Sequence, residues 1–284
     1  MQLVINKMKK IIYYLTTVLL LVFWPLTFYL ANVDSWITYA MGISILFLSL
    51  VFYQKGFPEY YFIYLLLPFI HPAFLAFPFI TLVFKLIFNR TSGVSKATLA
   101  IYLLLLVLVT IFAGKGFYAH SIFTPDPLAY DTLNKKISLI PSRSLAKVFE
   151  NKTTIFQDKF KSNVFISLDP NNYFFNHHPQ EIGGNQNLIK YSYLAIIPFL
   201  VGLYFILESK NKEWTITTLV CAVISVAFIN NQDRFDTLLY LPISLICLHG
   251  LKKIFQSPNH KFWLFSAVFI PTSLIELARI ILIK

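Results

Sequence analysis

The sequence is poor in charged residues, and acidic residues are the scarcer kind. Only 13% of its 284 residues are charged, with 13 acidic against 24 basic side chains, whereas soluble domains carry roughly a quarter. This scarcity excludes an ordinary soluble globular domain. The two cysteines, Cys221 and Cys247, both lie in apolar runs, which excludes a disulfide framework in the long polar segment of the chain.

Apolar residues take the place of the missing charges. They make up 57% of the chain and include 29 Phe and 16 Tyr. Several apolar runs exceed the roughly 18 residues that mark a membrane-spanning helix. Together with the shorter ones, the apolar runs cover residues 11–31, 37–53, 60–88, 97–113, 191–207, 214–230, 236–251 and 262–283. We therefore predict an all-α polytopic protein of the cell membrane. The first run is too long for a signal peptide and no cleavage site follows it, so we expect an uncleaved first helix.

Charge decides how the run at 60–88 crosses the membrane. Pro68, Pro72 and Pro78 interrupt its helical hydrogen-bond ladder, so it forms either one long broken helix or two short helices folded as a hairpin. Half of the basic residues lie in short loops that all face one side only if this run crosses twice. We prefer the hairpin, turning at His71, which gives about nine crossings. The positive-inside rule then places the N-terminus in the cytoplasm and explains much of the net charge of +11 without nucleic acid.

Residues 114–190 then form one long extracytoplasmic segment. It separates an N-terminal transmembrane bundle (1–113) from a C-terminal one (191–284). The segment mixes apolar positions with turn-forming TPDP, IPSR and LDPNN, and this mixture is too apolar for a disordered linker. We expect short helices and loops that lie on the membrane surface.

The phrase NHHPQE within this segment raises the question of a metal site. His177 and His178 are adjacent, so their side chains point in different directions on any regular element. Together with Glu181 they lack the close helical spacing of HExxH, and zinc takes three or four ligands, for which Asp169 and His120 are the further candidates. A metal site is the alternative; we prefer a hydrogen-bonded polar loop at the membrane interface and assign no metal.

A second polar cluster, NQDRFD, precedes the apolar run at 236–251. Arginine grips phosphate with two parallel hydrogen bonds, so Arg234 is a candidate lipid-phosphate-binding residue at the outer membrane boundary. The alternative is a snorkelling arginine that pairs with Asp233 or Asp236 and binds no ligand.

The C-terminal half of the chain contains four short sequence motifs in a fixed order. They are Asn151-Lys152, the patch Tyr173-Phe174-Phe175, the helix PFLVGLYFIL from Pro198 to Leu207, and RFDTLLYLP with Arg234, Phe235 and Leu241-Pro242. This order resembles polytopic glycosyltransferases of the GT-C superfamily, which use undecaprenyl- or dolichyl-phosphate sugars. The resemblance implies handling of a polyprenyl-phosphate-linked sugar in envelope glycosylation. A carboxylate would deprotonate the acceptor, and a cation near Arg234 would stabilise the departing phosphate.

The chain departs from that family in its first extracytoplasmic loop. Family members carry essential carboxylates in a long first loop, whereas here the loop ANVDSW has the single acid Asp34, which we interpret as a helix N-cap. Catalytic acids would then come from Asp126, Asp131 or Asp169 of the long segment, or from another membrane subunit. No cofactor is predicted, although the resemblance leaves a divalent metal open.

Three functions therefore stay open. The first is a GT-C-related enzyme, the second is a non-catalytic membrane partner that binds lipid or another envelope protein, and the third is a small-solute transporter. A transporter is less well supported, because only the run at 60–88 is broken and broken helices at matching positions in the two halves are expected there. The missing first-loop acids favour the second function over an active enzyme.

The predicted topology can be tested by labelling with a membrane-impermeant thiol reagent. Single cysteines would be placed at Ser142 and Ser209 after Cys221 and Cys247 are replaced by alanine. We expect labelling in intact cells at Ser142→Cys only, because position 142 belongs to the extracytoplasmic segment and position 209 to a basic cytoplasmic loop. Labelling of Ser209→Cys in intact cells would refute the topology.

Overall fold

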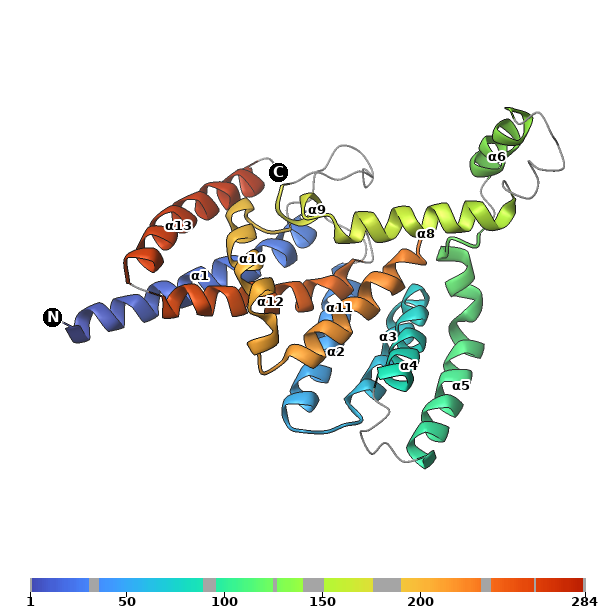
Figure 1. Ribbon diagram of the computed structural model, residues 1–284, viewed down its shortest axis with the longest axis horizontal. Coiled ribbons are helices and arrows are strands. Elements are labelled where there is room, and N and C mark those ends of the chain that lie inside the picture. The colour runs from blue at the N-terminus through green and yellow to red at the C-terminus, as the bar shows by residue number, and fades with distance from the viewer. Residues whose placement is uncertain are drawn as a thin grey trace. The chain divides into compact units, whose positions relative to one another are not determined.

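The computed structural model describes residues 2–30, 36–88, 96–124, 127–139, 151–175, 190–230, 236–257 and 259–282 (Figure 1). In these ranges the ordered elements are helices, and no strand is present beyond one isolated antiparallel bridge between Ser121 and Ile229. The all-α prediction is therefore confirmed. The chain divides into two compact units: unit 1 comprises Met1–Phe57, Asp169–Val220 and Thr237–Lys284, and unit 2 comprises Pro58–Leu168 and Cys221–Asp236. The predicted division into two transmembrane bundles (1–113 and 191–284) and an extracytoplasmic segment (114–190) depends on which side of a membrane each part occupies, and it stays a prediction.

Five helices of the described residues are long and apolar enough to cross a membrane. They are α1 (Gln2–Leu30), α2 (Trp36–Gln54), α5 (Lys96–His120), α12 (Thr237–Gln256) and α13 (Asn259–Leu282). Shorter apolar helices cover Tyr60–Ile70, Pro72–Ile87 and Tyr193–Tyr204. These helices support a membrane-embedded protein, and the count of about nine crossings stays a prediction.

In unit 2 the run at 60–88 is broken at His71, as the prolines predict. The elements in order are η1 (Tyr60–Leu66), α3 (Leu67–Ile70), η2 (Pro72–Leu75) and α4 (Ala76–Phe88). His71 is extended, with φ −150° and ψ 129°. Its Nδ1 accepts a hydrogen bond from the backbone N–H of Ala73 at 3.2 Å, so the histidine caps the helical turn that follows it.

The two arms on either side of His71 lie against each other in opposite directions. The Lys85 Nζ lies 4.8 Å from the centre of the Tyr60 ring, and the rings of Tyr64 and Phe77 are 4.8 Å apart. Because residues near the start of one arm contact residues near the end of the other, the segment has the hairpin geometry that the charge pattern favoured.

Helix α8 of unit 2 (Lys152–Leu168) is anchored at both ends. Asn151 caps its start, since the Asn151 Oδ1 accepts the backbone N–H groups of Thr153 and Thr154 at 2.8 and 3.2 Å. This gives the Asn151-Lys152 phrase a local structural role. Near the other end of α8, the buried Asn163 side chain donates two hydrogen bonds to the end of α11 (Lys212–Ala227). The acceptors are the carbonyl of Ala227, the last residue of α11, at 3.1 Å, and that of Ile229, just beyond it, at 2.9 Å.

Unit 1 has a core of aromatic side chains centred on Trp24, which is fully buried. The Trp24 ring lies 5.4 to 5.7 Å from the rings of Tyr191, Tyr240 and Tyr173. The Tyr191 hydroxyl is satisfied by Ser244, at 2.7 Å. These rings come from α1, from α9 (Asn171–Phe174), from the residues just before η3 (Tyr193–Ala195), and from α12, so the cluster joins parts of unit 1 that are distant in sequence.

This core also encloses a cation. Lys190 is only 1% exposed. Its Nζ donates to the Asn172 Oδ1 at 3.2 Å and lies 5.0 and 5.3 Å from the Tyr173 and Trp24 ring centres. Attraction of an ammonium to aromatic faces strengthens as water is removed. Lys190 therefore belongs to the packing of unit 1, and nothing in its sequence context predicted its burial.

Helices α10 (Ile196–Tyr204) and α12 pack so closely that their backbones touch. A Cβ added to Gly202 would lie 1.9 Å from the Ile246 carbonyl oxygen, and one added to Gly250 would lie 1.8 Å from the Pro198 carbonyl oxygen. Glycine at such crossings is the usual device by which membrane helices approach. The PFLVGLYFIL phrase thus has a steric basis.

We expect Gly202→Ala and Gly250→Ala to destabilise the protein, because each added methyl group would overlap a backbone carbonyl that cannot move alone. Overpacking costs on the order of 1–3 kcal/mol, so each variant should melt at a lower temperature in detergent. The matched control is Gly114→Ala in α5, where the nearest atom is the Thr110 methyl group at 3.9 Å. Equal melting temperatures for all three variants and the wild type would contradict this close crossing.

Candidate functional site

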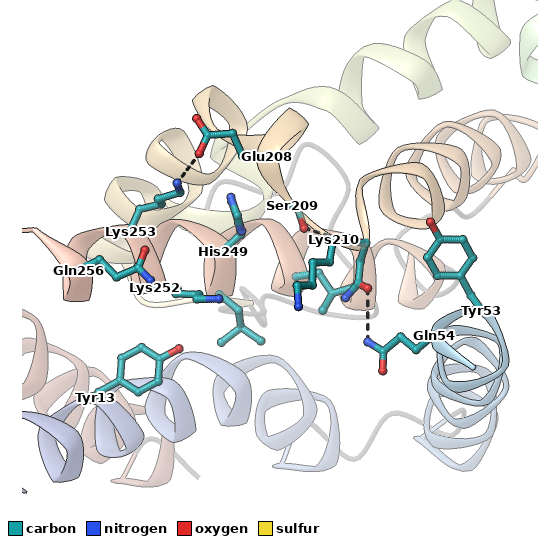
Figure 2. Close-up of a pocket in the computed structure, with 13 residues that line it drawn as sticks. Tyr13, Tyr53, Gln54, Glu208, Ser209, Lys210, His249, Lys252, Lys253 and Gln256 are labelled. Carbon is teal, nitrogen blue, oxygen red and sulfur yellow. Dashed lines mark hydrogen bonds and ion pairs between the residues drawn. The ribbon is translucent and has the colours of Figure 1, made fainter. Parts of the chain in front are cut away.

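A basic pocket lies within unit 1, with a volume of about 780 Å³ (Figure 2). Its wall combines cationic, amide, hydroxyl and apolar side chains. The lining residues are Tyr13, Tyr53, Gln54, Glu208, Ser209, Lys210, Asn211, Leu245, Leu248, His249, Lys252, Lys253 and Gln256. The lining is mainly polar and charged, and Leu245 and Leu248 are its aliphatic members.

The pocket is built from the ends of helices. Tyr13 comes from α1, Tyr53 and Gln54 from the last turn of α2, and six residues from the part of α12 between Leu245 and Gln256. The remaining wall is the link between α10 and α11, which contains η4 (Ile206–Glu208). Because α10 and α12 touch at Gly202 and Gly250, the chain that leaves α10 must run along the end of α12.

Three contacts hold this link against α12. The His249 Nε2 lies 2.9 Å from the Phe205 carbonyl oxygen, with the two groups sharing a hydrogen bond. One turn further along α12, Lys253 forms an ion pair with Glu208 (Figure 2). The Lys253 Nζ also lies 4.8 Å from the centre of the Phe205 ring. We call these contacts the Glu208 latch; they commit the Lys253 ammonium to the protein.

The other two lysines of the pocket are not committed in this way. The side chains of Lys210 and Lys252 make no hydrogen bond or ion pair with other residues in the described part of the chain. Figure 2 shows both extending into the pocket. Counting histidine as neutral, three lysines and one glutamate give the lining a formal charge of +2. The pocket therefore offers two uncommitted cations to an anionic ligand.

Hydrogen-bonding groups complete the polar part of the wall. The Gln54 Nε2 donates to the Asn211 Oδ1 at 3.4 Å, and the Asn211 carbonyl accepts the backbone N–H of Thr215 at 2.8 Å at the start of α11. Asn211 therefore joins the wall of the pocket to the start of α11.

The pocket also has an apolar part. Leu245 and Leu248 are half-buried and line it together with the half-buried ring of Tyr13. Cations and amides at helix ends, next to leucines on a membrane-length helix, suit an amphipathic anion with a charged head and a hydrocarbon tail.

The structure describes two of the three predicted catalytic acids, one in each unit. Asp131 is exposed on α6 (Pro127–Leu139) in unit 2. Asp169 belongs to unit 1, where its Oδ1 accepts the backbone N–H of Asn171 at 2.9 Å. That contact is a local turn interaction, so Asp169 has a structural role that the sequence analysis did not assign.

The other predicted site residues lie outside the described residues. They are Asp34, Asp126, His177, His178, Glu181 and Arg234. Of the histidines that are described, His120 lies beside His71, with the ring centres 4.8 Å apart. Within the described ranges no group of three or more His, Cys, Asp or Glu side chains could hold a metal ion.

The basic pocket was not predicted from the sequence, although its lysines are among the basic residues of the short loops. Lys210, Lys252 and Lys253 were counted only as charges that orient the chain in a membrane. The usable signal was the position of Lys252-Lys253 at the end of an apolar helix, together with the polar link SKNK after another. Only the α10–α12 crossing brings these two short motifs together.

Comparison with known proteins gives no relative: no family model, curated protein or solved structure matches the chain.

Proposed function

We propose that this protein binds the phosphate head group of a lipid in the basic pocket. The observation that carries the proposal is the pair of uncommitted ammonium groups, Lys210 and Lys252, at one end of a cavity whose wall also contains Leu245 and Leu248. Basic pockets between membrane helices recognise anionic lipid head groups. The leucines favour a lipid over a small soluble phosphate, because they would contact its hydrocarbon chain.

The side of the membrane is part of this proposal. Lys210, Lys252 and Lys253 belong to the basic short loops that the positive-inside rule assigns to the cytoplasm. The pocket would then face the inner leaflet, where anionic lipids attract basic segments. This differs from the earlier expectation of a phosphate at Arg234 on the outer side, and the two sites make opposite predictions for the same assay.

Binding rather than transfer chemistry is the function that the geometry supports. The one carboxylate in the pocket, Glu208, is paired with Lys253, so it is not poised to accept a proton from an acceptor hydroxyl. The proposal thus favours a non-catalytic lipid-binding membrane partner over an active glycosyltransferase. The resemblance to GT-C enzymes still suggests a lipid class for it, a polyprenyl phosphate.

The proposal is tested by native mass spectrometry of detergent-purified protein titrated with dioleoyl phosphatidic acid. We expect the wild type to bind one molecule and the double variant Lys210→Ala/Lys252→Ala to bind at least about tenfold more weakly. A hydrogen bond to a charged group contributes about 1.5–3 kcal/mol, and 1.4 kcal/mol is a factor of ten.

Two controls make the result specific. Lys7→Ala/Lys261→Ala removes the same charge from exposed lysines of unit 1 that do not line the pocket, and it should bind as the wild type does. Arg234→Ala should also leave binding unchanged. Loss of binding in Arg234→Ala with full binding in the pocket variant would move the phosphate site to Arg234 and refute the proposal.

A further inference from the structure

We infer that the basic pocket selects a dianionic phosphate monoester over a monoanionic phosphodiester, and that Glu208, by pairing with Lys253, limits the size of this preference. The inference rests on the proposed function, because it concerns the charge of the ligand in the same pocket. It assigns Glu208 and the two uncommitted lysines as residues that determine specificity.

The first step is charge matching. A phosphate monoester carries a charge of about −1.5 to −2 near neutral pH, whereas a diester with two substituents carries one negative charge. The lining has a formal charge of +2 once Glu208 is included. A monoester therefore neutralises the charge of the lining almost completely, while a diester offsets about half of it and gains correspondingly less Coulomb energy.

The second step is the number of contacts. A monoester presents three terminal oxygens and a diester two. Lys210 reaches the pocket from the link before α11, and Lys252 from α12 (Figure 2). Two ammonium groups from different elements can each engage a separate oxygen of a monoester, which leaves a third oxygen for the other polar groups of the wall.

The third step is the effect of Glu208 on the available charge. Glu208 holds Lys253 through the Glu208 latch, with 57% of the Glu208 side chain exposed. While the ion pair exists, Lys253 adds little net charge to the pocket. Replacing Glu208 by glutamine would release the Lys253 ammonium and raise the charge of the lining by one. Since Coulomb energy scales with ligand charge, a dianion would gain more affinity than a monoanion.

The experiment compares two lipids with identical acyl chains, dioleoyl phosphatidic acid and dioleoyl phosphatidylglycerol, by native mass spectrometry. For the wild type we expect at least about tenfold tighter binding of the phosphatidic acid. Glu208→Gln should tighten both complexes and widen the ratio of the two affinities. Lys210→Ala/Lys252→Ala should bring the two affinities within about twofold of each other, because the two ammonium groups that attract the dianion more strongly than the monoanion are absent.

The outcomes separate this inference from the proposed function. Equal affinities for the two lipids in the wild type, with both lost in Lys210→Ala/Lys252→Ala, would keep the lipid site and refute the selectivity. No binding of either lipid would refute the proposed function itself. A gain of affinity in Glu208→Gln cannot come from misfolding; unchanged or weaker phosphatidic acid binding in that variant would remove Glu208 from the account.

A further arm distinguishes a lipid from a soluble ligand of the same chemistry. Glycerol 3-phosphate has the monoester without acyl chains. We expect it to displace phosphatidic acid only at concentrations at least about a hundredfold above the lipid, because Leu245 and Leu248 would have no tail to contact. Competition at equal concentrations would assign the pocket to a soluble phosphate monoester and overturn its assignment as a lipid site.

Discussion

Contact between the backbones of α10 and α12 is the constraint on which most of unit 1 depends. At Gly202 and Gly250 there is no room for a Cβ atom, so the two helices meet where side chains would normally hold them apart. Beyond the crossing, the chain leaving α10 runs along α12, placing Phe205 beside His249 and Glu208 beside Lys253. The pocket is thus a consequence of helix packing, and its charged residues come from two segments that are distant in sequence.

Two lysines near α12, Lys190 and Lys252, have different environments. Near the start of the helix, Tyr240 belongs to the aromatic cluster around Trp24, where Lys190 is enclosed by rings and by Asn172. Near its end, Lys252 extends into an open cavity. The first arrangement satisfies the cation with protein groups and leaves no space for a ligand. The second has space and a polar wall, which is why we assign ligand binding there and packing to the core.

Much of the helical framework could be predicted, because apolar run length and proline position act locally. The break at His71 and the antiparallel arms around it followed from Pro68, Pro72 and the side of the basic loops. The site could not be predicted in the same way. Asp169, one of the proposed catalytic acids, accepts the backbone N–H of Asn171 in a local turn, and its catalytic role stays a prediction. Lys210 and Lys252 were read as orientation signals, since their proximity depends on a helix crossing that a single sequence does not reveal.

The most direct test of this account locates the lipid itself. A phosphatidic acid carrying a photoreactive diazirine in its acyl chain would be bound to the purified protein, irradiated and mapped by peptide mass spectrometry. The account predicts adducts on the α12 peptide that contains Leu245 and Leu248, and their loss in Lys210→Ala/Lys252→Ala but not in Lys7→Ala/Lys261→Ala. Adducts confined to other helices, or α12 adducts that persist unchanged in the pocket variant, would contradict a head group held by these lysines.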